Sequence, residues 1–487
     1  QEPMELRACF ECIITGPDIK IITNNGKDVA KAFLSCGLPK CEIIDVVIAE
    51  KLIANGEVEY RALSLKTIFD RYDIPEGMER SVVVHRLAEV WGRQEPLIKS
   101  SGLETVFDIE TQLIWITAKI ESAGVGIDVD RMLGLHDELG DKIDALAAEL
   151  EKSIPPDIPL HDRGKIQEYL NSTYALSLAK IDEESLQWIS NEDVRRLVSN
   201  LIEYWKTCRE LRDVELYMSM TGRDDRVRDS IEQLNTKTGR FYRPLQTVQK
   251  EGSMRSLFRA KEGYKLIVAD YSQHEARIIA GLSNDSAAID LFKSGKDIYL
   301  ETATKLIVGD SLGTSRLRAL GKEIVLGLNN GRSAYSIYES LARLGFGYDV
   351  DDVQGMILRY NMDFSGMKAW RDVVVTSALN DGAVSTPLGR TLKVDKNTNV
   401  NSLVNYPVQG TAADGFKMAL IILDDELAGQ DVGIVQILHD EVIVEARKDI
   451  VDSVTETVKN CMEQAFKEIL PNVPMVMNPA VRDSWGW

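Results

Sequence analysis

The chain has 487 residues, 44% of them hydrophobic and 27% charged, which is the balance of an ordinary globular protein with room for two to four domains. Its formal net charge of −19 gives no general sign of nucleic-acid binding. No apolar run reaches membrane-spanning length and no signal-peptide pattern opens the chain. With only six cysteines, we expect a reducing cytoplasmic compartment, no disulfide scaffold and no membrane partner.

Four of the cysteines, Cys9, Cys12, Cys36 and Cys41, fall near the start of the chain. Their spacing allows a zinc site. Because the first pair sits in an apolar, strand-like run, the pattern favours four small buried side chains instead.

Apolar runs predict strands at residues 19–23 and 42–48. Apolar residues then recur at helical spacing from 107 to 151, with a break at Gly124-Val-Gly126.

Beyond this break, either Asp128 or Asp130 is placed to cap the next helix. Residues 163–220 again show helical spacing, 236–270 combine strand and turn signals, and 286–380 are mainly helical. The remainder returns to mixed strands and helices.

The stretch from Thr236 to Lys265 is locally basic, with eight basic residues against two acidic ones. A solvated basic face would look the same, but a position directly before an aspartate-tipped strand favours phosphate binding. The basic residues are Lys237, Arg240, Arg243, Lys250, Arg255, Arg259, Lys261 and Lys265.

Two aspartates stand at the ends of apolar, strand-like runs. Lys265-Leu-Ile-Val-Ala leads into Asp270, and Gly433-Ile-Val-Gln-Ile-Leu leads into His439-Asp440. Two carboxylates brought together from separate strands can hold a pair of Mg²⁺ ions for an in-line phosphoryl displacement. A long helical insertion separates them, so we expect one sheet interrupted by a second module.

Six segments occur in an order that is highly specific when they are taken together. They are Thr238-Gly-Arg240, Asp270-Tyr-Ser-Gln-His-Glu-Ala-Arg277, Thr386-Pro-Leu-Gly-Arg390, Asn405-Tyr-Pro-Val-Gln-Gly-Thr-Ala-Ala-Asp414, Leu438-His-Asp-Glu441 and Asp483-Ser-Trp-Gly-Trp487. With these segments the chain resembles family A DNA polymerases, of the bacterial DNA polymerase I type. The likeness covers residues 105–487, and a fainter one covers the first hundred.

The resemblance implies a mixed α/β (α+β) fold, the right-hand polymerase of palm, fingers and thumb, with an N-terminal exonuclease-like α/β remnant. The implied domains are a degenerate 3′–5′ exonuclease-like domain at 1–104, a linker helix and thumb at 105–224, a first palm part at 225–285, fingers at 286–384 and a second palm part at 385–487.

The resemblance also assigns the catalytic centre. Asp270, Asp440 and the Tyr271 carbonyl are the expected ligands of two Mg²⁺ ions, for which Mn²⁺ can substitute. Glu441 is expected as an auxiliary acid, and His439 as a contact to the primer strand.

Five further residues are expected around the incoming nucleotide. The resemblance places Glu275 under the sugar, where it would exclude a 2′-hydroxyl, and Gln273 beside it. Arg318 and Lys322, four residues apart on one helix face, would reach the triphosphate, with Arg255 as an additional contact.

The terminal base pair has its own expected contacts. Arg240 and Gln409 would approach the minor groove, where N3 and O2 acceptors occur in every Watson–Crick pair. Asn405 would support the same surface.

Four positions depart from the family pattern. Leu326 and Asn330 stand where the family usually has aromatic residues facing the nascent base pair. Tyr299 replaces a histidine expected near the triphosphate, and Asn401 replaces an arginine. We therefore expect an active polymerase with relaxed nucleotide selection.

The first hundred residues resemble the later part of the family's 3′–5′ exonuclease domain. The opening Asp-x-Glu motif is absent, and Asn24-Asn-Gly-Lys-Asp28 is only a reduced form of the second motif. We expect a structural remnant without proofreading, unless residues before Gln1 supply the first motif.

The leading prediction is a DNA-templated DNA polymerase with primed DNA and deoxynucleoside triphosphates (dNTPs) as partners. A single-subunit RNA polymerase is a second reading, against which Glu275 argues. A catalytically weak, polymerase-derived DNA-binding module is a third. The acidic total charge leaves room for a basic accessory DNA-binding protein.

Overall fold

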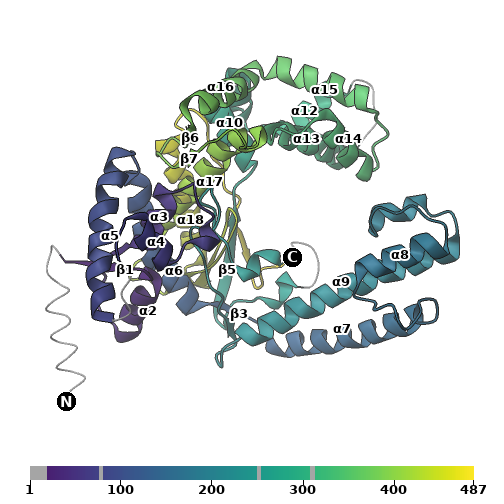
Figure 1. The fold of residues 1–487 in the computed structure, drawn as a ribbon, viewed down its shortest axis with the longest axis horizontal. Helices are drawn as coiled ribbons and strands as arrows, with labels where there is room; N and C mark the ends of the chain where they lie inside the picture. Colours follow the sequence, from purple (N-terminus) through teal and green to yellow (C-terminus); the bar gives the residue numbers. More distant parts are fainter. Residues whose placement is uncertain (1–18, 76–79, 249–253, 308–312, 487) are drawn as a thin grey trace. The chain divides into compact units, whose positions relative to one another are not determined.

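The protein is described by a computed structural model for residues 19–75, 80–248, 254–307 and 313–486. The chain forms two compact units, each assembled from separate stretches of sequence. The larger unit comprises Gln1–Gly124, Asp229–Gln246 and Glu262–Asp483, and the smaller comprises Val125–Arg228, Thr247–Lys261 and Ser484–Trp487. The chain contains both helices and strands (Figure 1), which confirms the expected mixed α/β class.

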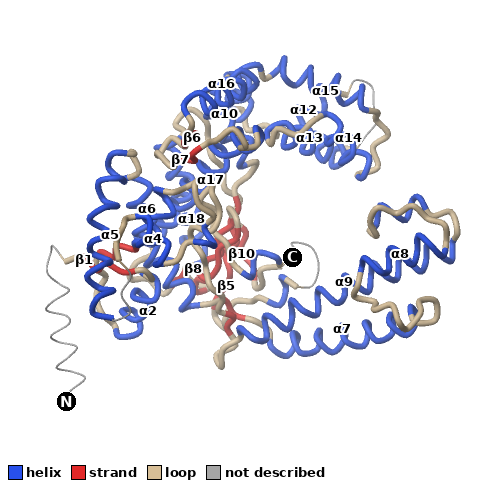
Figure 2. Tube along the Cα trace, viewed as in Figure 1, coloured by secondary structure: helices blue, strands red, loops and turns tan. Residues whose placement is uncertain are grey.

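A four-stranded antiparallel sheet lies in the larger unit, and its red strands gather in Figure 2. The strand order is β10 (Ala480–Arg482), β5 (Tyr264–Asp270), β9 (Glu441–Arg447) and β8 (Val432–Leu438). The two predicted aspartate-tipped strands therefore belong to one sheet, with β9 between them. The pairing of β5 with β9 runs from Tyr264 opposite Arg447 to Asp270 opposite Glu441.

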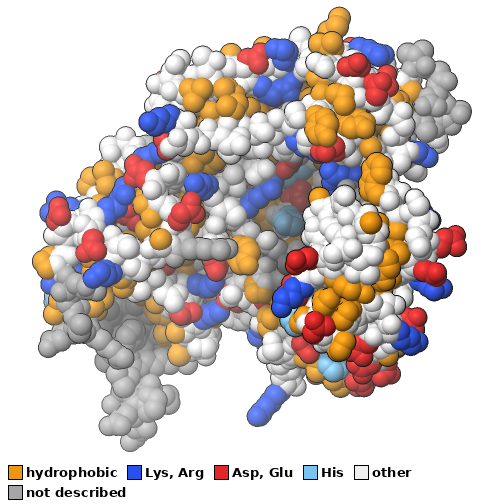
Figure 3. All heavy atoms as spheres, turned by 45° about the vertical axis from the view of Figure 1, so that its right-hand side comes forward, with side chains coloured by type: hydrophobic (Ala, Val, Ile, Leu, Met, Phe, Trp, Pro, Cys, Tyr) orange, Lys and Arg blue, Asp and Glu red, His pale blue; other side chains and the backbone are white. Residues whose placement is uncertain are grey.

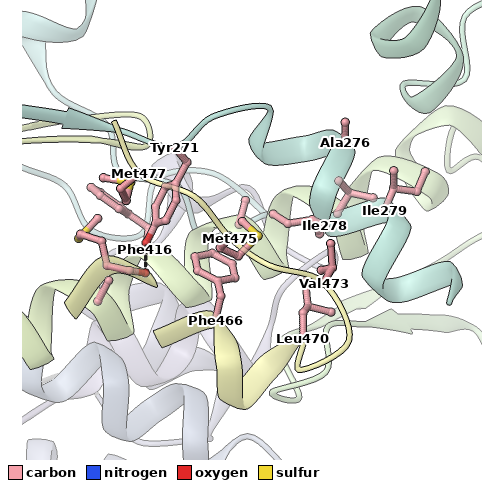
Figure 4. Close-up of a cluster of buried hydrophobic side chains, with 14 of the residues drawn as sticks. Tyr271, Ala276, Ile278, Ile279, Phe416, Phe466, Leu470, Val473, Met475 and Met477 are labelled. Carbon is pink, nitrogen blue, oxygen red and sulfur yellow. Dashed lines mark hydrogen bonds between the residues drawn. The ribbon is translucent and has the colours of Figure 1, made fainter. Parts of the chain in front are cut away.

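The sheet is covered by helices whose apolar side chains form the main core of the unit. Helices α17 (Val400–Glu426) and α18 (Val451–Ile469) pack closely on each other. Phe466 of α18 lies beside Tyr271, whose hydroxyl donates to the carbonyl oxygen of Met462 at 2.7 Å (Figure 4). This core holds the chain that follows β5 against the helices behind the sheet.

The helices of the interrupting module and its neighbours follow β5 in order. They are α10 (His274–Ser283), α11 (Ser286–Lys293), α12 (Ile298–Leu306), α13 (Thr314–Asn329), α14 (Ala334–Arg343), α15 (Val350–Asp363) and α16 (Ser365–Asp381). A small hairpin of β6 (Ala383–Ser385) and β7 (Thr391–Lys393) closes this part. The predicted helical insertion between the two aspartates is thereby confirmed.

The start of the larger unit is a small α/β layer. Its elements are β1 (Lys20–Thr23), α2 (Gly26–Cys36), β2 (Glu42–Asp45), α3 (Val46–Ile53), α4 (Leu65–Arg71), α5 (Arg80–Ser100) and α6 (Glu104–Ala123). The strands β1 and β2 pair in parallel.

The strand predicted at 42–48 is too long, because the chain turns into a helix after Asp45. The carboxylate of Asp45 accepts hydrogen bonds from the backbone N–H groups of Val47 and Ile48, at 2.8 and 3.3 Å. These contacts satisfy two N–H groups that have no partner inside a helix, so an apolar run that reads as a strand begins α3 instead.

The smaller unit is mainly helical. It contains α7 (Val129–Leu150), α8 (Arg163–Thr173) and α9 (Glu192–Met220), with a two-residue pairing of β3 (Val125–Gly126) and β4 (Arg226–Val227). The predicted break at Gly124–Gly126 is confirmed, and Asp128 rather than Asp130 caps α7 by accepting from Arg131 N at 3.1 Å. The α7, α8 and α9 helices share a separate apolar core around Leu170, Leu201 and Trp205.

A network of buried charges joins distant segments of the larger unit. Arg390 donates to Glu110 and to Asp414, at 2.7 Å each, and Lys417 donates to Glu110 at 2.5 Å. All four side chains are buried, at no more than 1% exposure. Burial alone would raise the pKa of Glu110, but the charges of Lys417 and Arg390 outweigh it and hold that pKa below 4.5.

Charged side chains of both signs are interspersed with apolar ones over most of the face drawn in Figure 3. Among the described residues, no helix combines the length and the hydropathy that crossing a membrane requires. Of the four cysteines considered for zinc, Cys9 and Cys12 lie outside the described residues, while Cys36 is exposed and Cys41 half-buried. The zinc prediction is therefore not tested, whereas the expectation of a buried side chain is wrong for Cys36.

Candidate active site

The two predicted aspartates lie at the same end of the central sheet. Asp270 is the last residue of β5 and pairs in register with Glu441, the first residue of β9. Directly facing residues of an antiparallel pair have Cα atoms roughly 4.5–5.5 Å apart. Asp440 precedes Glu441 in the two-residue turn between β8 and β9, so both aspartates lie at the same end of the sheet.

The turn that carries Asp440 is tight. His439 adopts a left-handed backbone conformation, with φ of 56°, and its side chain is exposed. Asp440 lies 3.1 Å from His274, measured from carboxylate Oδ2 to ring Nδ1. Burial works to raise the pKa of Asp440, but this hydrogen bond and the charge of Arg240 outweigh it and hold the pKa below 3.8.

His274 was not among the predicted site residues. It is the first residue of α10, is 6% exposed, and its ring stacks on Tyr271 with centroids 4.4 Å apart. A sequence signal existed, because one of only five histidines in the chain stands between Gln273 and Glu275 in the first catalytic motif.

Arg240 and Glu275 form an ion pair, with guanidinium Nη2 2.7 Å from carboxylate Oε1. Both side chains are partly exposed, at 35% and 24%. Gln273, just before α10, has a left-handed φ of 54°, and its side-chain oxygen accepts from Ile298 N at 2.8 Å. Arg240, predicted to contact the base pair, and Glu275, predicted to lie under the sugar, are thus in direct contact.

Helix α13 presents the predicted triphosphate residues. Arg318 Nε donates to Asp297 Oδ2 at 2.9 Å, and its guanidinium lies 5.3 Å from the ring centroid of Tyr299. Lys322, one turn further, is exposed. Tyr299 is buried, and burial raises the pKa of its hydroxyl, so the residue is a neutral surface beside Arg318.

The end of α13 carries two of the positions that depart from the family pattern. Leu326 packs partly buried against the main core, and Asn330 follows the last residue of the helix. The Asn330 carbonyl accepts from Asn405 Nδ2 at 3.5 Å, so α17 and the end of α13 meet here. Asn401 lies against Gly331, where an added Cβ would come within 2.6 Å of its side-chain oxygen.

Two other predicted site residues are Arg255 and Gln409. Arg255 belongs to the smaller unit, where it is 7% exposed and its guanidinium lies 4.4 Å from the Trp485 ring centroid. Gln409 is half-buried in α17. Their predicted contacts to triphosphate and DNA remain predictions.

The carboxylates of Asp270 and Asp440, at the end of the sheet, suit Mg²⁺ better than they suit a metal ion whose ligands all come from the protein. In the described part of the chain, no three His, Cys, Asp or Glu side chains lie close enough together to hold an ion. Mg²⁺ is commonly bound by one or two carboxylates together with waters and substrate phosphates. Asp270 and Asp440 fit that pattern.

The sequence profile described as DNA polymerase family A matches residues 129–487. The chain belongs to DNA polymerase family A. Members of this family use divalent metal ions, which agrees with the two aspartates at one end of the sheet.

Bacterial relatives cover most of this family A chain. DNA polymerase I of Aquifex aeolicus is 28% identical over 459 residues, which is 89% of this chain and 75% of the relative. The corresponding enzyme of Pseudomonas aeruginosa and the thermostable one of Thermus aquaticus are each 28% identical, over 90% and 84% of this chain. The match spans 51% of each of those two longer relatives.

A solved structure shows the same fold. The POL domain of Pol1 from M. smegmatis, in a complex with DNA primer-template and dNTP, has a TM-score of 0.89 at 23% identity. The match covers 98% of this chain and 88% of that one. The right-hand polymerase fold expected from the sequence is thereby confirmed, whereas an exonuclease origin of the first hundred residues is not.

Proposed function

We propose that the protein is a DNA-templated DNA polymerase that adds deoxyribonucleotides to a primer 3′-hydroxyl. The observation that carries the proposal is the register of β5 and β9. In this chain of family A, it brings Asp270 to the same end of the sheet as Asp440. With it we infer a cytoplasmic location, which the bacterial origin of the relatives supports.

In this proposal Asp270, Asp440 and the Tyr271 carbonyl hold two Mg²⁺ ions, and Mn²⁺ can replace them. When bound, such ions supply activation of the 3′-hydroxyl and charge neutralisation of the triphosphate. Glu441, 7% exposed next to Asp440, adds a further carboxylate to the edge. His439, exposed in the turn, is left available for the primer strand.

The nucleotide lies between α10 and α13 in this proposal. Arg318 and Lys322 bind the triphosphate from one face of α13, with Gln273 on the sugar side. Glu275, held at 2.7 Å by Arg240, sits under the sugar and excludes a 2′-hydroxyl. This arrangement favours deoxyribonucleotides and argues against the RNA polymerase alternative.

Arg240, Asn405 and Gln409 contact the primer-terminal pair from the minor groove, where the acceptors are common to all base pairs. The chain then verifies pair shape without reading sequence. We assign the palm to residues 225–285 and 385–487, the fingers to 286–384, and the linker helix and thumb to 105–224.

We also propose that residues 1–104 are a remnant that does not proofread. The opening Asp-x-Glu motif is absent, and Asp45 in the strand-like run caps α3 with its side chain. A 3′-mismatched primer should therefore persist when it is incubated with the protein and Mg²⁺ in the absence of dNTPs. Stepwise shortening of that primer would contradict this.

The polymerase proposal is tested by extension of a primed single-stranded template with Mg²⁺ and either dNTPs or ribonucleotides. Asp270→Ala and Asp440→Ala should each lower the rate roughly a thousand-fold, because a metal ligand contributes several kcal/mol at the transition state. Asp431→Ala is the matched control, since Asp431 is an exposed carboxylate just before β8, at the opposite end of that strand.

Deoxyribonucleotide-dependent extension that is lost in both variants and kept in the control supports the proposal. Full extension by either variant would contradict the catalytic assignment. If the intact chain binds primer–template but does not extend it, the DNA-binding module becomes the better account.

A further inference from the structure

His274 is buried beside the two aspartates at the end of the sheet. The ring is 6% exposed, with Tyr271 stacked on one face and Phe466 meeting it edge-on at a centroid distance of 5.2 Å. Tyr271 is itself anchored by its hydroxyl to the Met462 carbonyl at 2.7 Å. The orientation of the imidazole is therefore fixed by packing before any substrate arrives.

The two ring nitrogens have different surroundings. Nδ1 lies 3.1 Å from the Asp440 carboxylate, whereas Nε2 is buried without a hydrogen-bond partner. An ionised carboxylate can only accept hydrogen bonds, so the ring nitrogen that faces it must be the donor. The favoured tautomer thus carries its proton on Nδ1 and donates it to Asp440.

The hydrogen bond from His274 holds the side chain of Asp440, which the turn between β8 and β9 does not hold by itself. Asp440 sits between β8 and β9, next to His439 with its left-handed backbone, and 39% of its side chain is exposed. The hydrogen bond from His274 holds one carboxylate oxygen, Oδ2, from the side of α10. The other oxygen stays available for a cation.

We propose that His274 is a positioning residue that orients Asp440 for divalent-metal binding. The proposal rests on the proposed function, because it assumes that Asp440 is a metal ligand. Groups that orient metal ligands in this way typically change metal affinity about 10–100-fold when they are removed. His274 itself does not touch the metal or the substrate.

The test is Mn²⁺ binding followed by electron paramagnetic resonance, with no turnover. The protein is bound to primer–template with a dideoxy-terminated primer and the next correct dNTP. His274→Phe keeps a stacking ring but removes both nitrogens, and it should weaken Mn²⁺ binding at least about ten-fold. His274→Asn, whose amide nitrogen can take the place of Nδ1, should keep the affinity close to that of the wild type.

Primer–template affinity and the thermal unfolding midpoint are measured for each variant to detect a loss of packing. Should His274→Phe fail to fold, His274→Leu takes its place with the same expectation. Wild-type Mn²⁺ affinity in the folded apolar variant overturns the proposal. Equal weakening in His274→Asn also overturns it, because the role would then be one of ring packing.

Asp440→Asn separates this proposal from the polymerase assignment. If that variant binds Mn²⁺ as the wild type does, the metal role of Asp440 fails and the proposed function fails with it. If Asp440→Asn loses binding while His274→Phe keeps it, only the role of His274 is refuted.

Discussion

At the scale of single residues, the contacts between predicted site residues say more than the residues alone. Arg240 and Glu275 come from segments 35 positions apart, yet they pair at 2.7 Å. A fixed carboxylate excludes a hydroxyl better than a mobile one, because no rotamer change relieves the clash. In the proposed function, this pair would link the check on the terminal base pair to the choice of sugar.

Glu275→Ala should let ribonucleotides enter. We expect the ratio of kcat/KM for ribonucleotides to that for deoxyribonucleotides to rise roughly 10–200-fold, the range that one small steric group commonly controls. Single-nucleotide incorporation kinetics measure this ratio. Glu301→Ala is the control, since Glu301, on α12, pairs instead with Lys296, which precedes that helix. An unchanged ratio in Glu275→Ala would remove Glu275 from the sugar site.

Asn330→Tyr should make nucleotide selection stricter. The new ring can stack on the nascent base pair, a contact worth about 1–3 kcal/mol, so we expect misincorporation to fall roughly ten-fold. Misincorporation frequencies on a defined template provide the measurement. Leu358→Tyr, at a site on α15 that is 62% exposed, controls for adding a tyrosine to the helical module. A wild-type frequency already as low as in the variant would refute relaxed selection.

At the scale of elements, different interactions position the end of the sheet that carries the aspartates and the helices that cover the sheet. The strand register sets where the aspartates lie, while the buried charges tie α6 to α17 and to the turn before β7. Burial lowers the pKa of Lys417 to about 8 against the opposing charge of Glu110. These ions were removed from water at a cost that only their mutual pairing offsets.

Glu110→Gln should therefore destabilise the protein by about 3–5 kcal/mol, because it leaves buried cations without their counter-charge. Chemical denaturation near pH 7 measures this. Glu95→Gln, which breaks an exposed pair with Lys99 on α5, is the matched control and should cost at most about 1 kcal/mol. Equal losses in the two variants would show that the buried network is dispensable.

The stability difference between wild type and Glu110→Gln should also depend on pH, and its direction follows from the pKa of Glu110. The pKa of Glu110 is lowered on folding from 4.5, so its stabilising effect is complete above that value and is lost as pH falls through the lower folded value. The difference in unfolding free energy between wild type and Glu110→Gln should shrink below about pH 4.5. A difference that grows in acid would contradict the assigned direction.

The sequence predicted those parts of the molecule that depend on local pattern. The strand ends at Asp270 and before His439, and the helix break at Gly124, follow from apolar runs and glycine. Asp45 was misread because a side-chain cap can start a helix inside an apolar, strand-like run.

Contacts between segments far apart in the chain could not be predicted from the sequence. Glu110 and Arg390 lie 280 positions apart, and His274 and Asp440 lie 166 apart, so only the fold reveals that they meet. The Arg240–Glu275 pair was missed for the same reason, although both residues had been assigned to the site.

At the scale of the whole molecule, the proposed function requires a chain of net charge −19 to bind DNA through local basic surfaces. The smaller unit offers one, although its Val125–Arg228 stretch has 22 acidic and 14 basic residues. A pocket of about 260 Å³ there is lined by His161, Arg163, Arg209 and Arg212, together with Tyr204, Trp205 and Cys208, and by no acidic residue. We expect this lining to contact phosphates of bound DNA.

Replacing Arg209 and Arg212 together by Gln should weaken primer–template binding at low salt. If each arginine meets one phosphate, the slope of log affinity against log salt should fall by about 1 per residue removed. Fluorescence anisotropy over a salt series measures both effects. Arg196→Gln on the same helix is the control, because Arg196 is paired with Asp193. An unchanged slope in the double variant would exclude this pocket as a DNA contact.

The most direct test of the account is where divalent ions bind in the ternary complex. The protein would be crystallised with dideoxy-terminated primer–template, the matching dNTP and Mn²⁺, and anomalous scattering would locate the ions. We predict two Mn²⁺ sites that share Asp270 and Asp440 as ligands, with the triphosphate completing the coordination. Ions bound without either aspartate, or a triphosphate placed away from the edge where β5 and β9 end, would contradict the account.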